Sequence, residues 1–221
     1  LKAEKHRVAF MFENVASMDN ADRDVVTHYL GVRPHVGCAS DISQARRKRY
    51  LWLSWQVTPT EDVTVVQSTA TWAMKFQAQI PPSRLWVDKG WQLMGPEDVR
   101  LPTFMRSLPK NKETYLPAGI AATPPDARRR WKAHRYRYPP YQYRREFCVQ
   151  SKRNPRLVRV INSEEREVLM FLGRGATRYA MNPVKAKASP IDLEDDRCSL
   201  IGNTFHAGFV ALAFAPLMVK E

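Results

Sequence analysis

Hydrophobic residues near the start of the chain form short runs separated by polar segments. Residues 8–12 are a continuous apolar run, typical of a buried parallel strand, and Glu13 follows at its carboxyl end. Residues 22–30 predict a short helix with an acidic first turn. Residues 46–55 are basic and then aromatic, which predicts a second extended segment. Because ligands bind at the carboxyl edge of open α/β sheets, we expect Glu13 and a guanidinium pair to meet there.

The pattern changes over residues 57–149, where prolines and glycines interrupt short strand-like runs. Those runs are residues 63–66, 71–74 and 85–87. The density of chain breakers favours irregular loops with short strands and little helix. Trp72, Trp86 and Trp91 are expected in the core of this lobe, in preference to a role as base-stacking platforms. Residues 151–155 are interpreted as the linker that returns to the first lobe.

Two further helices are predicted near the C-terminus. Residues 158–171 carry a capping signal, with Asn162 or Ser163 ahead of Glu165, followed by an apolar face. Residues 207–217 are apolar nearly all round, so this helix is expected to be buried in a core.

The segment between these two helices predicts a tight turn. Gly202 allows such a turn, because glycine adopts backbone conformations that other residues avoid. Asn203 or Thr204 can then cap the helix that follows. His206, two residues after Thr204, is interpreted as a structural residue.

Positive charge is concentrated in one part of the chain. The 221 residues, 44% of them hydrophobic, suffice for one large domain or two small ones, and the net charge is +13, from 35 Lys and Arg against 22 Asp and Glu. Residues 128–159 hold 12 of the basic residues and a single acid, Glu146, so the remainder is close to neutral. This concentration indicates a polyanionic partner and favours nucleic acid. A membrane surface is less favoured, because the stretch contains Pro139 and Pro140 and lacks an amphipathic helical period.

Within this basic stretch, cations alternate with aromatic residues. The candidate DNA-binding residues are Arg128, Arg129, Arg130, Lys132, Arg135, Arg137, Arg144 and Arg145. Such cations can neutralise phosphates and give a salt-sensitive affinity, while tyrosine rings can stack on an unpaired base. In the alternative interpretation, the tyrosines pack against the lobe and the arginines face water.

The cysteines and histidines do not indicate a disulfide scaffold or a metal site. Cys38, Cys148 and Cys198 are odd in number and widely spaced, so we expect a reducing compartment. The longest apolar stretch, residues 209–219, is too short to cross a bilayer, and no membrane partner is expected. Because the first strand comes almost immediately after Leu1, we expect a chain that is cut inside a domain.

The N-terminal pattern resembles a known family. Residues 12–15 read Phe-Glu-Asn-Val, and after a helix and a proline-containing turn the chain reads Ser-x-Ala-x-Arg-x-Arg-Tyr-x-Trp. This order is similar to the sixth and eighth motifs of the cytosine-5 DNA methyltransferases, most of all the eukaryotic de novo type. Aligned in this way, Ala45 takes the place of the usual Gln, and Arg47 and Arg49 take the two arginine positions. Gln44 is one residue out of register and is not given that role.

The resemblance implies a chemical role for these residues. When a thiolate adds to carbon 6 of cytosine, electron density moves onto ring nitrogen 3 and the exocyclic amine. A carboxyl group hydrogen-bonded at that edge, here Glu13, stabilises the developing charge, and Arg47 can hold the carboxyl and reach the ring carbonyl. The target base must be flipped out of the duplex to reach such a pocket. Taken alone, a Glu-Asn-Val tripeptide occurs by chance in many proteins, and a basic run such as residues 46–49 is usually a solvated face or a nucleic-acid patch.

The C-terminal segments resemble two more motifs of the same family. Residues 158–171 resemble the ninth motif, which organises the recognition domain, although residues 170–174 depart from the usual Met-Gly-Phe-Pro continuation. Residues 197–206 resemble the tenth motif, whose turn closes over S-adenosylmethionine. The resemblance therefore implies that the cofactor neighbours are Gly202, Asn203, Thr204 and Phe205.

Four motifs in the family's order imply an α/β fold: a partial Rossmann-like sheet of the S-adenosylmethionine-dependent methyltransferases, with an irregular, β-containing target-recognition lobe. The expected division is residues 1–56 and 158–221 for the catalytic domain and residues 57–157 for recognition. The expected activity is methyl transfer from S-adenosylmethionine to a flipped cytosine in double-stranded DNA, in the nucleus.

Two elements of the family are missing from this sequence. It has no glycine-rich loop for the cofactor and no Pro-Cys dipeptide for the nucleophile, both of which precede the sixth motif in the family; Cys38 lacks that context. The chain alone is therefore expected to be inactive. It would be a partial gene product, one half of a split enzyme whose N-terminal half is a separate chain, or a non-catalytic nucleic-acid-binding relative. An RNA-binding protein that uses the basic stretch is a further alternative.

Overall fold

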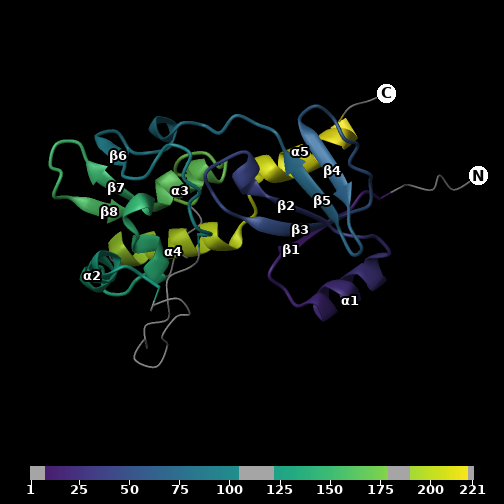
Figure 1. Ribbon diagram of the computed structural model, residues 1–221, viewed down its shortest axis with the longest axis horizontal. Coiled ribbons are helices and arrows are strands. Elements are labelled where there is room, and N and C mark those ends of the chain that lie inside the picture. Colours follow the sequence, from purple (N-terminus) through teal and green to yellow (C-terminus); the bar gives the residue numbers. More distant parts are fainter. Residues whose placement is uncertain (1–7, 105–121, 179–189, 219–221) are drawn as a thin grey trace, which may run out of the picture. The chain divides into compact units, whose positions relative to one another are not determined.

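The computed structural model describes residues 8–104, 122–178 and 190–218 (Figure 1). The chain divides into two compact units, each with its own hydrophobic core. Unit 1 comprises Leu1–Ile42, Arg47–Gln79 and Phe209–Glu221, and unit 2 comprises Ser43–Arg46 and Ile80–Gly208.

Unit 1 is built on a five-stranded mixed sheet with strand order β1-β3-β2-β5-β4. Its strands are β1 (Met11–Val15), β2 (His35–Cys38), β3 (Lys48–Leu53), β4 (Val63–Gln67) and β5 (Trp72–Phe76). Only β2 and β5 pair in parallel; the other three pairings within this sheet are antiparallel. Together with the helices, this sheet confirms the predicted α/β class.

Helix α1 (Asn20–Leu30) forms where the sequence predicts a helix. The Asp19 side chain caps it by accepting a hydrogen bond from the Ala21 amide, and Gly31 ends it in the left-handed conformation, at φ 67°. The helix lies against one face of the sheet, where Trp52 Nε1 donates to Thr27 Oγ1 over 3.0 Å.

Helix α5 (Ala207–Met218) begins as predicted and covers the other face of the unit 1 sheet. Phe209 packs on β2 so closely that a Cβ added at Gly37 would lie 2.8 Å from its ring. The prediction that this helix is buried in a core is confirmed for one face only. Phe209 and Ala213 face the core, whereas Leu217 is 43% exposed.

Strand β1 differs from its prediction as a buried parallel strand over residues 8–12. It spans Met11–Val15 at the edge of the sheet and pairs antiparallel with β3, so Glu13 lies within the strand and not after it. Phe12 and Val15 are 42% and 41% exposed, because β3 is the one strand that borders β1 among the described residues.

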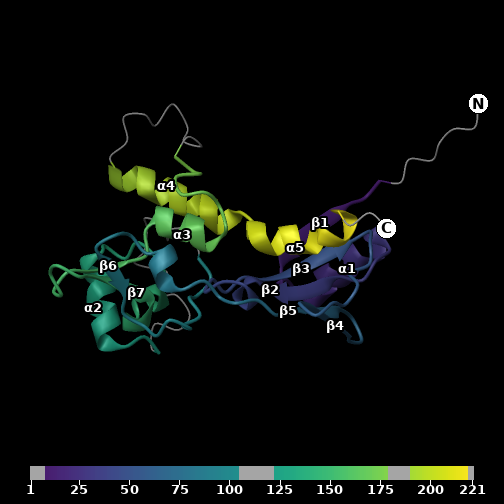
Figure 2. The same cartoon turned by 90° about the horizontal axis from the view of Figure 1, so that it is seen from above.

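Unit 2 combines a small antiparallel sheet, of order β6-β7-β8, with three α-helices. Its elements are β6 (Trp91–Leu93), α2 (Pro125–Ala133), β7 (Cys148–Ser151), β8 (Val158–Val160), α3 (Ser163–Leu169) and α4 (Pro190–Asn203). Helices α3 and α4 lie side by side (Figure 2), joined by hydrogen bonds from the Ser163 amide and hydroxyl to the Glu194 carboxylate, each 2.6 Å long. Trp86 is buried in this unit's core and Trp91 packs against that core, as expected.

Several local predictions in unit 2 are wrong. Residues 85–87 were expected to be extended, but Ser83–Leu85 is a 3-10 helix followed by a turn. Residues 151–155 connect β7 to β8 as a hairpin and do not return the chain to unit 1. The start of the basic stretch is the helix α2, where Ala127 and Trp131, four residues apart, face the core.

The unit boundaries differ from the predicted lobe of residues 57–157 at both ends. Strands β4 and β5 belong to unit 1, because β5 pairs with β2, and Trp72 therefore lies in unit 1. Helices α3 and α4 stay in unit 2, and the chain re-enters unit 1 at Phe209.

One stretch of the described chain, Leu193–Met218, is long and apolar enough by composition to cross a membrane, with a mean hydropathy of 1.4. It is not one helix, since α4 ends at Asn203 and α5 starts at Ala207. At 14 and 12 residues, each helix is shorter than the roughly 20 residues that a bilayer core requires.

Candidate functional site

Glu13 on β1 and Arg49 on β3 form a close ion pair on one face of the unit 1 sheet. Arg49 Nε lies 2.6 Å from Glu13 Oε1, and the two side chains are 9% and 24% exposed. Glu13 is opposite Leu51 in the strand register, and Arg49 is two residues from Leu51, so alternation places both charged side chains on the same face. Neither atom has a well-aligned hydrogen-bond partner, so the contact is an ion pair of short distance and bent geometry.

Arg47 completes the charged group. It is 4% exposed. Burial and, to a smaller extent, the adjacent Arg49 lower the pKa of Arg47 to about 10, against the opposing influence of Glu13. Burial also lowers the pKa of Arg49, against the opposing influence of Glu13 and Cys38. The Arg47 guanidinium is therefore charged at neutral pH, and both arginines lie within electrostatic range of the Glu13 carboxylate.

The structure brings together the three predicted catalytic residues, with a change of partner. The sequence predicts that Arg47 holds the Glu13 carboxyl, whereas Arg49 makes the 2.6 Å contact. The strand bounds explain the difference, because Arg49 lies in β3 and pairs with β1, whereas Arg47 precedes β3, which begins at Lys48.

Cys38 lies at the end of β2 that is next to this charged group. It is opposite Lys48 in the register, is partly exposed, and accepts a hydrogen bond from Ser40 Oγ over 3.1 Å. The sequence gives no signal for this placement, which results from the β2 and β3 pairing. Gln44 is not part of the group: it belongs to unit 2, where its amide nitrogen donates to the Pro81 carbonyl.

The predicted cofactor residues all lie in unit 2, and their local structure differs from the prediction. Gly202 and Asn203 are the last two residues of α4, so the non-helical segment between α4 and α5 is residues 204–206. Asn203 and Phe205 are exposed, and Gly202 and Thr204 are partly buried. His206 is buried, and its Nε2 lies 3.1 Å from Ser43 Oγ, which agrees with a structural role.

The predicted DNA-binding cations are of two kinds. Arg130 and Arg137 are tied into unit 2: Arg130 Nη2 is 2.8 Å from Asp126 Oδ2, and Arg137 Nε is 2.5 Å from Asp195 Oδ1. Arg144 is exposed but pairs with Glu146 at 2.9 Å. The exposed members of the set are Arg128, Arg129, Lys132, Arg135, Arg144 and Arg145.

The tyrosines of the basic stretch pack mainly inside unit 2. Tyr138 and Tyr143 are 1% and 2% exposed, and burial raises the pKa of both. The Arg166 guanidinium lies 4.5 Å from the Tyr138 ring centre, and the Tyr143 hydroxyl is 2.8 Å from His134 Nδ1. For these two residues, the packing alternative holds. Tyr136, 37% exposed, is accessible to a ligand.

In the described part of the chain, no group of three His, Cys, Asp or Glu side chains is placed to hold a metal ion. No protein-family model matches the sequence, and no curated protein matches it. Among solved structures, the chain is similar to the crystal structure of the S. pombe Dnmt2 methyltransferase, with 13% sequence identity and a TM-score of 0.43. That similarity covers 96% of this chain and 67% of the other. Values this low do not assign the chain to a family.

Proposed function

We propose that the chain is the C-terminal part of a DNA (cytosine-5) methyltransferase, which moves a methyl group from S-adenosylmethionine to cytosine in double-stranded DNA. One observation carries the proposal. Glu13 and the two buried arginines Arg47 and Arg49 occupy the positions at which the sequence resembles the sixth and eighth motifs of that family.

The chemistry of this group suits a flipped cytosine. After a thiolate adds to carbon 6, charge develops at ring nitrogen 3 and the exocyclic amine, and a carboxyl group fixed at that edge stabilises it. The ion pair with Arg49 fixes Glu13, while Arg47 is a second cation for the ring carbonyl. Because Glu13 and Arg49 lie on the paired strands β1 and β3, little reorganisation is needed when the base enters.

The methyl donor fits the predicted residues only in part. Asn203 and Phe205 are exposed at the end of α4, as contact with S-adenosylmethionine requires, and Thr204 lies between them, whereas Gly202 is helical. When bound, the donor would supply an activated methyl group on sulfur. The loop that would hold its methionine end is not in this sequence, so these residues would contact the donor from one side.

Methyl transfer should require a second component. We expect no activity from this chain alone, and transfer of a labelled methyl group to carbon 5 of cytosine in duplex DNA once residues that carry a cysteine nucleophile and a glycine-rich loop are added. Such an enzyme would work in the nucleus. Persistent inactivity with tight duplex binding would instead support a non-catalytic binding relative.

The exposed cations of α2 are expected to contact DNA phosphates. Replacing Arg128, Arg129 and Lys132 together by glutamine should weaken duplex binding by about tenfold or more and reduce the slope of log affinity against log salt by about 1 per lost contact. Fluorescence anisotropy at several salt concentrations measures both quantities.

The matched control replaces Lys75, Arg84 and Lys89, which are exposed and lie outside the basic stretch. An equal loss in this control would show that net charge alone drives binding. A preference for single strands over duplex, together with indifference to Glu13→Gln, would favour the RNA-binding alternative.

A further inference from the structure

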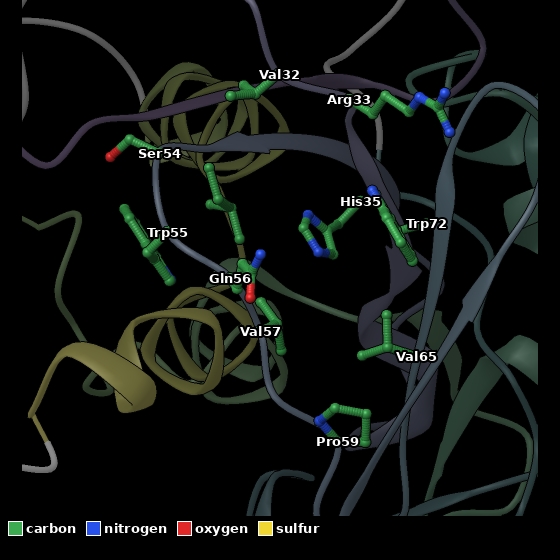
Figure 3. A pocket seen from close by; sticks show the side chains of 11 residues that line it. Val32, Arg33, His35, Ser54, Trp55, Gln56, Val57, Pro59, Val65 and Trp72 are labelled. Atoms are coloured by element: carbon green, nitrogen blue, oxygen red, sulfur yellow. The ribbon is translucent and has the colours of Figure 1, made fainter. Parts of the chain in front are cut away.

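A second candidate site lies in unit 1, at the end of the sheet opposite the charged group. A cavity of about 430 Å³ opens beside the end of β3, where Leu53 pairs with Met11, whereas Arg49 lies at the other end and pairs with Val15. Its walls come from residues 32–35, residues 53–59, Val65 on β4 and Trp72 on β5. The lining residues that matter here are Arg33, His35, Trp55, Val57, Val65 and Trp72 (Figure 3).

His35 is the buried polar group of this cavity. Its ring lies among the lining side chains in Figure 3 and is nearly parallel to the Trp72 ring, with an interplanar angle of 22° and centres 6.4 Å apart. The residue is only 7% exposed, and its Nδ1 has no hydrogen-bond partner. Burial lowers the pKa of His35, against the opposing influence of the Leu51 backbone. A buried polar atom without a partner is rare, and a ligand atom can supply one.

The charge around the cavity selects the kind of ligand. Among the described residues that line it, Arg33 is the one charged side chain, and it is exposed. In the described part of the chain no carboxylate lines the cavity, whereas an anion can pair with Arg33. Trp55 and Trp72 supply aromatic surface, and Trp55 is held in place because its Nε1 donates to the Ala213 carbonyl over 2.9 Å.

We propose that this cavity binds a small molecule with a planar heteroaromatic ring and a phosphate or carboxylate group. The ring packs against Trp55 and Trp72 and forms a hydrogen bond with His35 Nδ1, while the anionic group pairs with Arg33. The site is separate from the Glu13 group and does not depend on methyl transfer.

The test uses the full chain and four probes. Adenosine 5′-monophosphate carries both features with a phosphate, and indole-3-acetate carries both with a carboxylate. Adenosine lacks the anion, and inorganic phosphate lacks the ring. Calorimetry should show binding of at least one of the first two, at least about tenfold tighter than either adenosine or phosphate. The His35 ring resonances, assigned by their loss in His35→Gln, should shift on saturation.

Variants separate this site from general anion binding. Arg33→Gln should weaken binding of the anionic probe about tenfold and leave adenosine unchanged, since an exposed position tolerates the replacement. Arg84→Gln, an equal charge change in unit 2, should have no effect. The proposal is overturned if neither anionic probe binds at millimolar concentration, if Arg33→Gln binds as wild type does, or if the His35 resonances stay unchanged. The proposal is also overturned if the anionic probe loses affinity only in the variant that replaces Arg128, Arg129 and Lys132.

Discussion

Replacing Glu13 by glutamine is expected to slow methyl transfer to cytosine by about 100- to 1,000-fold in the reconstituted enzyme, the range seen when one preorganised stabilising group is removed. Glutamine keeps the size of the side chain but removes the charge that pairs with Arg49 at 2.6 Å. The rate of label transfer under saturating DNA and donor measures the effect. Duplex affinity should change little, because the exposed cations supply it.

The control for this variant is Glu61→Gln, which removes an exposed carboxylate from the same unit. It should leave the rate unchanged. A thermal unfolding curve for each variant separates a lost catalytic group from a lost fold. A Glu13→Gln enzyme that is well folded and transfers methyl at the wild-type rate would remove this residue from the mechanism.

The largest expected loss of stability comes from Glu167→Ala. The Glu167 side chain is fully buried at the end of α3 and accepts hydrogen bonds from Arg197 Nη2 and the Thr177 amide, each 2.9 Å long, and from the Gly175 amide. Alanine leaves these donors and the Arg197 cation without their acceptor, which should lower the free energy of unfolding by about 3–5 kcal/mol. Chemical denaturation, followed by a signal that reports the unfolding of unit 2, measures this change.

The same variant has a pH signature. Burial acts to raise the pKa of Glu167, but hydrogen bonds from Thr177, Arg197 and Gly175 outweigh it, so the pKa is below its ordinary value of 4.5. A depressed carboxyl pKa stabilises the folded state above about pH 4.5, and this contribution is lost as pH falls through the folded-state value. The difference in the free energy of unfolding between wild type and Glu167→Ala should therefore be largest at pH 7 and become smaller in acid.

Glu164→Ala is the matched control, from the same helix. Glu164 is 23% exposed and pairs with Arg178, which is itself 58% exposed, so its removal should lower stability by less than about 1 kcal/mol. Similar losses for the two variants would contradict the central role assigned to the buried carboxylate.

Elements with local signals could be predicted from the sequence. Helix α1 has its cap at Asp19 and its stop at Gly31. Helix α3 has a complete capping box, in which Asn162 and Glu165 each accept from the other's backbone amide. These hydrogen bonds join residues close in the chain, so the residue types alone indicate them.

Elements that depend on distant pairing could not be predicted. Strand β2 has only four residues and carries no strong pattern of its own, whereas β5 lies at the strand-like run predicted over residues 71–74; the parallel pairing between the two joins distant segments and has no local signal. The same limit applies to the cations. Arg130 pairs with Asp126 one turn away, which the sequence could have shown, whereas the partner of Arg137 is Asp195, 58 residues further on.

The candidate site was predictable as residue types but not as a geometry. Glu13 and the two arginines were identified from motif spacing, yet the choice of Arg49 as the close partner follows from the β1 and β3 register. The turn predicted at Gly202 is displaced because α4 continues through Asn203. The His35 cavity had no sequence signal, since the sheet pairing brings residues 32–35, 53–59, 65 and 72 together.

The most direct test of the central claim is the exchange of a cytosine C5 hydrogen with water, without any methyl donor. When a thiolate adds to carbon 6, carbon 5 becomes basic, so release of tritium from 5-tritiated cytosine in duplex DNA reports formation of the adduct that Glu13 is proposed to stabilise. With the nucleophile-bearing residues added, wild type and Glu61→Gln should release tritium. Glu13→Gln should release it at least about 100-fold more slowly. Equal release by wild type and Glu13→Gln would contradict the account.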